Sequence, residues 1–367
     1  MTIRSTLTQR HCCGPRCNAG GLPVPVPQPG PVPQPGQYEE PRHHGLPGSG
    51  DSPGILREED KKRYMKLTWM GTACFVLESG DQRILFDPFL ELAGGTTAVS
   101  EEELLACDTI FVTHCHFDHL YEAQELVAQG GGNVSLFCTK QCCSTLEGFL
   151  EDQSNVAMIR PGETYDLYDA APAVRKTRPA AGSGGQPAES RPEAETAGRM
   201  TGASHPQPGE PGFVRIRVLQ GRHIEFQKRH VMETMHPLRL LRYAGNLPWL
   251  FWANRTFQEA GEIVAFDVHA EGREILILGS LALDPEETYP EGVDVLVLPF
   301  QGSNDLPARA REVLERLRPK AVLLSHFDNA FPPMSRDVDL RPLKKLIREE
   351  FPQIRVVRPT AFSPVEL

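Results

Sequence analysis

The chain has 367 residues, with 38 basic and 48 acidic side chains and a formal net charge of −10. Its Lys and Arg residues form no cluster of the kind that binds a phosphate backbone, which argues against nucleic acid as a partner. No apolar run is long enough to span a bilayer and the N-terminus lacks an apolar signal segment, so we expect a cytoplasmic protein.

Two segments are rich in Pro, Gly and polar residues. The first, 1–60, contains the run LPVPVPQPGPVPQPG, and the second, 170–212, contains AGSGGQPA. Neither can bury enough apolar surface to offset its chain entropy, so we predict a disordered N-terminal tail and a low-complexity insertion. The expected domain spans 61–367 and contains that insertion. About 265 residues remain, which is ample for one large core.

The nine cysteines are an odd number and favour free thiols in a reducing compartment. Cys12, Cys13 and Cys17 lie near His11 in the tail, but their spacing fits no zinc module. We therefore expect no metal site in the tail.

Strands and helices alternate in the first half of the domain. Lys66–Leu77 and Arg83–Phe86, on either side of the turn Ser79–Gln82, predict a β-hairpin. Ser100 and Glu103 match a capping box, which predicts a short helix through residue 106. Further elements are expected as strands at 108–113 and 134–138 and as helices at 120–127 and 141–150.

The second half repeats this alternation. Strands are predicted at 213–219, 263–268, 274–278, 293–299 and 321–325, with an amphipathic helix at 307–317. The apolar stretch Met232–Phe257 interrupts the pattern and holds Trp249 and Trp252, two of the three tryptophans. Aromatic side chains serve a core and a pocket equally well, so both roles stay open for this stretch.

The most informative motif lies directly after the strand predicted at 108–113. Thr113–His119 reads THCHFDH and places three imidazoles and a carboxylate within six positions. His114 and His116 are two residues apart, so they point the same way on an extended segment. Asp118 and His119 lie where a helix begins and can face a second point nearby. Imidazole and carboxylate are ligands of divalent metals, so this spacing suits two ions side by side.

The motif resembles the central H-x-H-x-D-H sequence of the metallo-β-lactamase superfamily. The resemblance extends from Lys66 to Arg358 when the insertion is excluded, and it also rests on Leu67–Leu77 (LTWMGTACFVL) and Ile84–Pro88 (ILFDP). It implies an α/β fold, the four-layer αββα sandwich, with the metal-bearing loops along one edge. This resemblance predicts the fold and the metal chemistry far better than it predicts the substrate.

The resemblance also assigns residues outside the motif. His223, after a predicted strand, matches the third histidine of the first metal, and His326 matches the last ligand of the second. His230 and His236 are rivals of His223, but neither directly follows a strand. Asp87 matches an aspartate that holds a metal-binding loop without touching metal; a turn-forming role before proline is its alternative.

One position departs from the family pattern. Ser280 ends the sequence ILGS where the family places an aspartate that bridges both metals. A neutral hydroxyl supplies no charge to offset the repulsion between two cations. The second metal therefore binds weakly, or another carboxylate replaces the bridge, with Asp284 and Asp328 as candidates.

The resemblance implies a hydrolase that holds one or two Zn²⁺ ions, with Mn²⁺ or Fe²⁺ as alternatives. A metal-bound hydroxide would attack an ester, amide or phosphodiester bond of a small-molecule or lipid-like substrate, and Asp118 would orient it and shuttle its proton. Cys115 is expected to point away from the metals. Two alternatives stay open: a non-catalytic metal-binding member, and a di-iron redox protein, for which the sequence offers no flavin domain.

Overall fold

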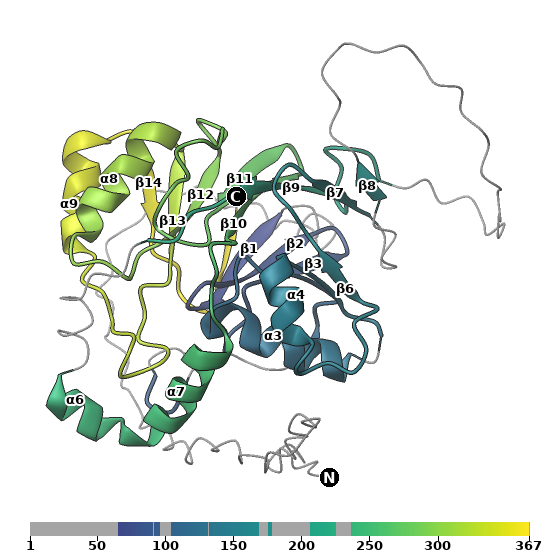
Figure 1. The fold of residues 1–367 in the computed structure, drawn as a ribbon. Coiled ribbons are helices and arrows are strands. Elements are labelled where there is room, and N and C mark those ends of the chain that lie inside the picture. The colour runs from purple at the N-terminus through teal and green to yellow at the C-terminus, as the bar shows by residue number, and fades with distance from the viewer. Residues whose placement is uncertain are drawn as a thin grey trace, which may run out of the picture.

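The computed structural model describes residues 65–90, 92–95, 104–130, 132–168, 175–177, 206–224 and 236–366. Their strands form two mixed sheets that pack face to face, with helices on the outer side of each sheet (Figure 1). This layered arrangement confirms the predicted αββα fold class. No helix in these ranges is long and apolar enough to cross a bilayer.

The first sheet has seven strands in the order β15-β1-β2-β3-β4-β5-β6. They are β1 (Lys66–Gly71), β2 (Cys74–Ser79), β3 (Gln82–Phe86), β4 (Thr109–Phe111), β5 (Ser135–Cys138), β6 (Val156–Met158) and β15 (Pro364–Glu366). The prediction of one strand over Lys66–Leu77 is wrong, because the chain reverses after Gly71. Gly71 and Thr72 have φ values of 124° and 49°, which a tight turn requires.

Two helices cover the outer face of the first sheet, α3 (Phe117–Gln129) and α4 (Lys140–Leu146). Leu120, Ala123 and Val127 of α3 recur on one helix face and are buried against the sheet. Thr139 caps α4, because its hydroxyl accepts a hydrogen bond from the Cys142 amide. The metal motif therefore runs from the end of β4 into the first turn of α3.

The second sheet has eight strands in the order β14-β13-β12-β11-β10-β9-β7-β8. They are β7 (Thr164–Leu167), β8 (Arg175–Thr177), β9 (Val214–Gln220), β10 (Val264–Ala270), β11 (Arg273–Ile277), β12 (Val295–Pro299), β13 (Ala321–Ser325) and β14 (Arg355–Val357). The helices α8 (Leu306–Leu317) and α9 (Arg341–Glu350) cover its outer face beside β12–β14 (Figure 1). Strand β8 lies inside the range 170–212 that we predicted to be a low-complexity insertion.

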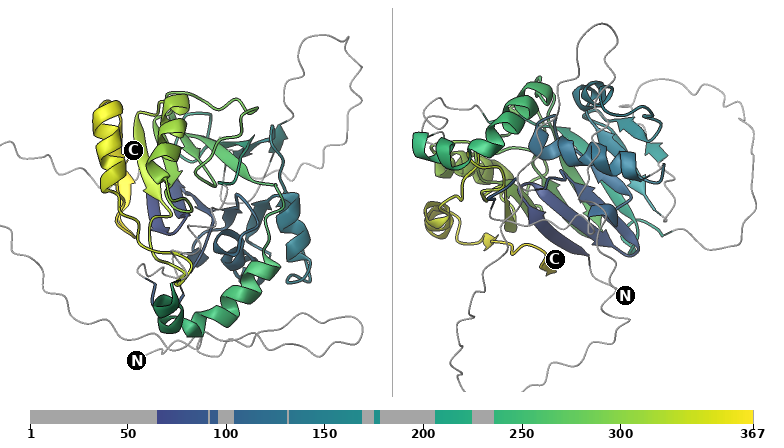
Figure 2. Two further views of the ribbon diagram at one scale, coloured as in Figure 1. Left: turned by 60° about the vertical axis from the view of Figure 1, so that its left-hand side comes forward. Right: turned by 90° about the horizontal axis from the view of Figure 1, so that it is seen from below.

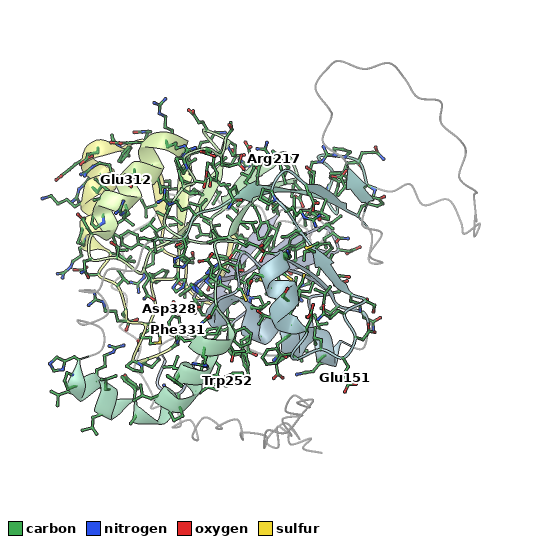
Figure 3. The ribbon with its side chains drawn as sticks, in the orientation of Figure 1. Glu151, Arg217, Trp252, Glu312, Asp328 and Phe331 are labelled. Atoms are coloured by element: carbon green, nitrogen blue, oxygen red, sulfur yellow. The ribbon has the colours of Figure 1, made fainter. Side chains whose placement is uncertain are left out.

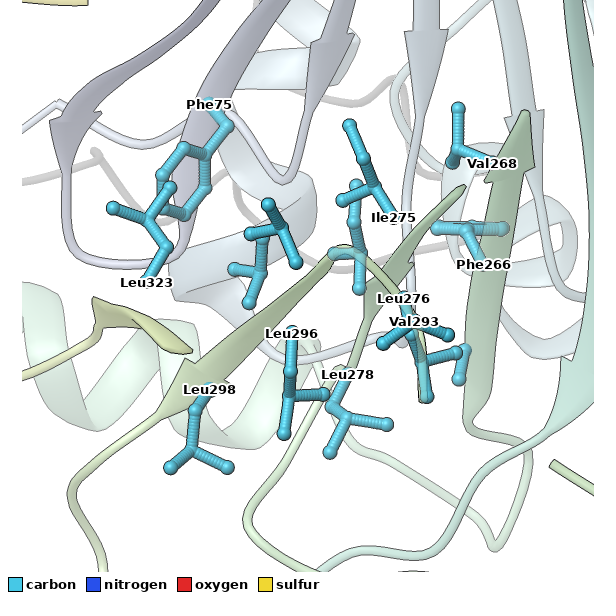
Figure 4. Close-up of a cluster of buried hydrophobic side chains, with 14 of the residues drawn as sticks. Phe75, Phe266, Val268, Ile275, Leu276, Leu278, Val293, Leu296, Leu298 and Leu323 are labelled. Carbon is cyan, nitrogen blue, oxygen red and sulfur yellow. The ribbon is translucent and has the colours of Figure 1, made fainter. Parts of the chain in front are cut away.

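Apolar side chains from both sheets fill the space between them. Phe75 of the first sheet and Leu323 of the second approach each other in Figure 4, and Phe266, Ile275 and Leu296 extend the same cluster. Strands β12 and β13 are buried along their whole length because the core covers one face and helices cover the other. This explains their continuous apolar sequences.

The apolar stretch at 232–257 contains α6 (Pro237–Arg242), the 3-10 helix η1 (Ala244–Asn246) and α7 (Leu247–Thr256) at one end of the sandwich (Figure 2). The buried ring of Trp249 lies 5.4 Å from Phe117 and 5.3 Å from Tyr121, measured between ring centroids. Trp252 packs on Tyr121 and Phe257. Both tryptophans thus belong to the packing of α7 on α3.

Candidate metal centre

Three histidines from two separate segments meet at the edge of the sandwich. The Nε2 atom of His114 lies 3.0 Å from Nδ1 of His116. The ring of His223, after β9, lies 4.8 Å from that of His116 and 5.3 Å from that of His114. Each offers one ring nitrogen, and the three atoms lie within 4.8 Å of one another.

A second group of three lies beside the first. Asp118, His119 and His326 also offer donor atoms within 4.8 Å of one another. Asp118 Oδ2 lies 3.0 Å from His326 Nε2 and 3.8 Å from His119 Nε2. The rings of His114 and His119 are 4.0 Å apart, so the two groups adjoin. The structure therefore brings together all six residues that the sequence nominated.

A buried network orients both groups from behind. Asp87 accepts hydrogen bonds from the Thr113 amide at 2.7 Å and from the Thr113 hydroxyl at 2.8 Å. The same carboxylate lies 2.9 Å from His119 Nδ1. The Thr113 hydroxyl, whose proton goes to Asp87, lies 3.0 Å from His114 Nδ1 and can accept from it. One carboxylate thereby fixes the Nδ1 side of both rings, so that the Nε2 atoms of His114 and His119 face the other candidate ligands.

His223 is oriented by its own backbone. Its Nδ1 atom lies 2.7 Å from the carbonyl oxygen of Ile224, so Nδ1 carries the proton and the lone pair is on Nε2. The rival His236 instead lies at the start of α6, where its Nδ1 accepts from the Leu238 amide. His230 lies outside the described residues.

The turn at Thr72 supports the loop that carries His326. The His326 amide donates to the Thr72 carbonyl at 2.6 Å, and both carboxylate oxygens of Asp328 accept from the Thr72 amide at 3.2 and 3.1 Å. Asp87 and His326 both have positive φ, 44° and 53°. Such backbone is costly for residues with a side chain and tends to gather at functional sites.

Ser280 lies at the edge of the same site. Neither Asp284 nor Asp328, the predicted substitutes for the bridging carboxylate, joins it there. The Ser280 hydroxyl accepts a hydrogen bond from the Ile224 amide at 3.0 Å. Asp328 is bound to Thr72, and Asp284 accepts from the Glu286 amide at 2.9 Å. Within the described ranges, neither aspartate belongs to the two donor groups.

Burial keeps the first group neutral. Burial, together with the neighbouring imidazoles of His223 and His119, outweighs the opposing charge of Asp118 and lowers the pKa of His116 to about 4. Burial likewise lowers the pKa of His114 and of His223. Neutral imidazoles are the form that binds metal, so these three side chains are ready to do so at neutral pH.

The second group carries charge. Burial alone would raise the pKa of Asp118, but the imidazoles of His119 and His326 outweigh it and hold the pKa well below its usual range. Burial opposes protonation of His119, yet the carboxylates of Asp87 and Asp118 raise its pKa. A cation placed between Asp118 and His119 would take the place of that proton.

A cavity of about 330 Å³ opens above both groups. His116, Asp118, His119, His223 and His326 form part of its lining. The other lining residues are Phe117, Ile224, Asn254, Gly279, Ser280, Leu281, Pro299, Gln301, Gly302, Phe331 and Met334. In Figure 3, Phe331 and Asp328 lie between α7 and the second half of the sandwich. The described lining contains no Lys or Arg, and its side chains are largely apolar.

The donor sets fit divalent metal ions. Three neutral imidazoles leave one position open in a tetrahedral zinc site, and two imidazoles with one carboxylate suit zinc, iron or manganese. The supporting roles of Thr113 and Thr72 were not predicted. The position of Thr113 just before His114 was a usable signal, because a hydroxyl there can reach the ring. The role of Thr72 depends on a contact with residue 328 that no local pattern reveals.

Comparison with known proteins points to one superfamily. The model of a beta-lactamase superfamily domain matches residues 66–193, which confirms the resemblance to the metallo-β-lactamase superfamily. A metal-dependent hydrolase of Archaeoglobus fulgidus is 38% identical over 85 residues, which is 23% of this chain and 35% of that protein. A metal-dependent hydrolase of Thermoplasma volcanium is 37% identical over 104 residues, 28% of this chain and 43% of that protein. The matches thus span less than half of either relative.

Solved structures also match this chain, at low identity. A metallo hydrolase from Ignicoccus hospitalis is 19% identical with a TM-score of 0.49, and the alignment covers 83% of this chain and 99% of that one. The metallo-beta-lactamase fold protein YhfI of Bacillus subtilis is 12% identical with a TM-score of 0.47, covering 83% and 100% of the two chains.

Proposed function

We propose that this protein is a metal-dependent hydrolase of a small, largely apolar substrate. The observation that carries the proposal is the convergence of two adjoining three-residue donor groups, five of whose six residues line one cavity. Isolated histidines at strand ends are common, but six candidate ligands from three separate segments rarely meet by chance. The relatives named metal-dependent hydrolase support the same conclusion.

In this proposal His114, His116 and His223 hold the first ion, and Asp118, His119 and His326 hold the second. When bound, Zn²⁺ lowers the pKa of water to about 7 and polarises the oxygen of a carbonyl or phosphoryl group. Asp118 is ionised and lies against His326, so its carboxylate can accept a proton at Oδ2 during the reaction. The fixed tautomer of His223 keeps its Nδ1 proton out of that transfer.

The cavity wall favours an apolar substrate. Phe117, Ile224, Leu281, Phe331 and Met334 contribute apolar side chains to it, and Asn254 and Gln301 contribute uncharged amides. Such a wall excludes water and binds acyl or alkyl groups. We propose an ester, thioester or amide of a small or lipid-like molecule as the leading substrate class, with a phosphodiester of similar size as the second.

The test begins with metal-stripped protein titrated separately with Zn²⁺, Mn²⁺ and Fe²⁺. Hydrolysis of p-nitrophenyl butyrate and of bis(p-nitrophenyl) phosphate is then measured alongside metal content. We expect one or two ions per chain, metal-dependent turnover of the ester, and loss of turnover in Asp118→Asn. The matched control is His236→Gln, which changes an exposed imidazole at the start of α6 that belongs to no described donor group. Metal binding with no turnover of either probe would instead favour the alternative, a non-catalytic metal-binding member.

That alternative has one specific observation in its favour. Ser280 stands where the family places the bridging aspartate, and among the described residues neither Asp284 nor Asp328 belongs to either donor group. A chain that holds one ion firmly and the second weakly can bind metal without efficient catalysis. A stoichiometry of one ion with no turnover would support this alternative, whereas turnover at one ion per chain would reject it.

A further inference from the structure

Four cysteines gather behind the loop that carries His114 and His116. Cys115 comes from that loop, Cys138 ends β5, and Cys142 and Cys143 lie in α4. All four are free thiols, and only Cys143 is partly exposed. Neither the proposed metal sites nor the proposed reaction uses them.

Cys138 and Cys143 lie in direct contact. Their sulfur atoms lie 3.6 Å apart, with one of the thiols placed to donate a hydrogen bond to the other. Cys143 is reachable from solvent, whereas Cys138 is buried beneath it. The hydrogen bond from Cys138 lowers the pKa of Cys143, which increases its thiolate fraction. Burial raises the pKa of Cys74, by contrast, so that thiol stays protonated.

We propose that Cys138 and Cys143 are a peroxide-sensitive dithiol that closes to a disulfide and loosens the metal centre. The Cys143 thiolate attacks one oxygen of hydrogen peroxide, which breaks the O–O bond, releases hydroxide and leaves a sulfenic acid. The Cys138 sulfur then attacks that sulfenic sulfur, and its proton leaves with the hydroxyl as water. Two thiols are oxidised and one peroxide is reduced to two waters.

In this proposal, closure moves α4 relative to the sheet. A disulfide needs a sulfur–sulfur distance of about 2.05 Å, so the present 3.6 Å must shorten by roughly 1.5 Å. Cys138 is held in a strand between β4 and β6, and its carbonyl accepts from the Ile159 amide at 2.9 Å. The sheet resists displacement more than the short helix does, so α4 takes up most of the change.

That movement reaches the metal-ligand loop through Cys115. The Cys115 sulfur lies 3.1 Å from the Thr145 hydroxyl and 3.9 Å from the Gln141 carbonyl, and both residues belong to α4. Cys115 stands between His114 and His116 in sequence. A shift of α4 therefore removes support from two imidazoles whose positions fix the first ion, and metal affinity falls.

Peptide mapping tests the bond itself. The reduced full-length protein is treated with stoichiometric hydrogen peroxide, alkylated and digested with trypsin, which cleaves after Lys140 and so separates the two cysteines. We expect a cross-linked pair of peptides, lighter by two hydrogen atoms than their sum, which separates on reduction. The cross-link is lost in Cys143→Ser and in Cys138→Ser, and it persists in the matched control Cys107→Ser. A cross-link that survives in Cys143→Ser, or one that joins another cysteine, would overturn the proposal, as would its absence in the unsubstituted protein.

A second measurement tests the coupling, which rests on the proposed metal site. Zinc affinity of the reduced and the peroxide-treated protein is measured by competition with a chromophoric chelator. We expect weaker zinc binding after oxidation, recovery on reduction, and no change in Cys143→Ser. Equal affinity in both states would overturn the coupling. Failure of the reduced protein to bind zinc at all would overturn the proposed function instead, while the peptide map would still decide the disulfide.

Discussion

At the scale of single residues, Asp87 serves both donor groups with one carboxylate. It contacts His119 directly and reaches His114 through the Thr113 hydroxyl. The sequence predicted a loop-holding role for Asp87 from family resemblance alone. The contact of Asp87 with both histidines depends on the proximity of β3 and β4, which are parallel neighbours in the sheet.

Asp87→Asn should weaken metal binding by about 10- to 100-fold, because a neutral amide supports the two imidazoles less well than a carboxylate. Affinity is measured by chelator competition at neutral pH. Asp166→Asn is the matched control, since Asp166 pairs with Arg215 on the second sheet. An unchanged affinity in Asp87→Asn would show that the ligands hold their geometry without this network.

Ser280→Asp should raise the metal content from one ion towards two. The new carboxylate can keep the hydrogen bond from the Ile224 amide and supply the missing anionic bridge. Ser280→Ala is the control and should stay at one ion. Elemental analysis after dialysis measures the stoichiometry. Two ions in the unsubstituted protein, or no gain in Ser280→Asp, would reject the view that the bridge position limits the second site.

The pKa of His116 predicts a pH dependence for the metal-free protein. Burial lowers the folded pKa from 6.5 to about 4, so between these values the unfolded imidazole binds a proton that the folded one does not. Stability therefore rises with pH across this window and is lost as pH falls from 6.5 towards 4. Urea titrations at several pH values measure the free energy of unfolding. It should fall less steeply with decreasing pH in His116→Asn than in the unsubstituted protein. The same slope in both proteins would mean that His116 titrates normally in the fold.

At the scale of elements, sequence periodicity located the strands that deliver the ligands. Each observed strand begins and ends within a residue or two of its predicted limits. This holds for the strands before His114, His223 and His326. The short strands β6, β7, β8, β14 and β15 and the helix α9 were not predicted. A three- or four-residue strand has too few positions for a periodic pattern, and its pairing partner lies elsewhere in the sequence. The capping box at Ser100 lies outside the described residues.

Helix α7 supplies a further prediction at this scale. Trp249 is buried and stacks edge-on against Phe117, a residue of the cavity wall. Trp249→Ala should destabilise the protein by about 3–5 kcal/mol, as removal of a large buried aromatic side chain usually does. Phe251→Ala on the same helix is the control, because Phe251 is 74% exposed and its loss should change stability by no more than about 0.5 kcal/mol. Urea unfolding measures both, and equal effects would place Trp249 outside the core.

At the scale of the whole molecule, the candidate site exists only when both sheets pack together. The first half contributes His114, His116, Asp118 and His119 after β4, and the second contributes His223 after β9 and His326 after β13. The family resemblance could nominate these residues, but their convergence depends on the sandwich. The residues that join the halves behind the site, such as Thr72 and Asp328, are 256 positions apart.

The composition of the two Pro- and Gly-rich segments predicts that the fold does not depend on them. Deletion of 1–58 should leave the melting temperature and zinc affinity unchanged, because these residues lack core-forming periodicity.

The internal replacement must be narrower than the predicted insertion. Strand β8 pairs with β7 at Thr164↔Thr177, so residues 178–205 are the ones to exchange for a short Gly-Ser linker. Extending the replacement to 175–205 removes β8 and exposes the edge of β7. We expect a lower melting temperature for the longer replacement alone, measured by calorimetry. A large loss in the shorter replacement would show that the segment takes part in the fold, and equal stability of both would show that β8 contributes little to the sheet.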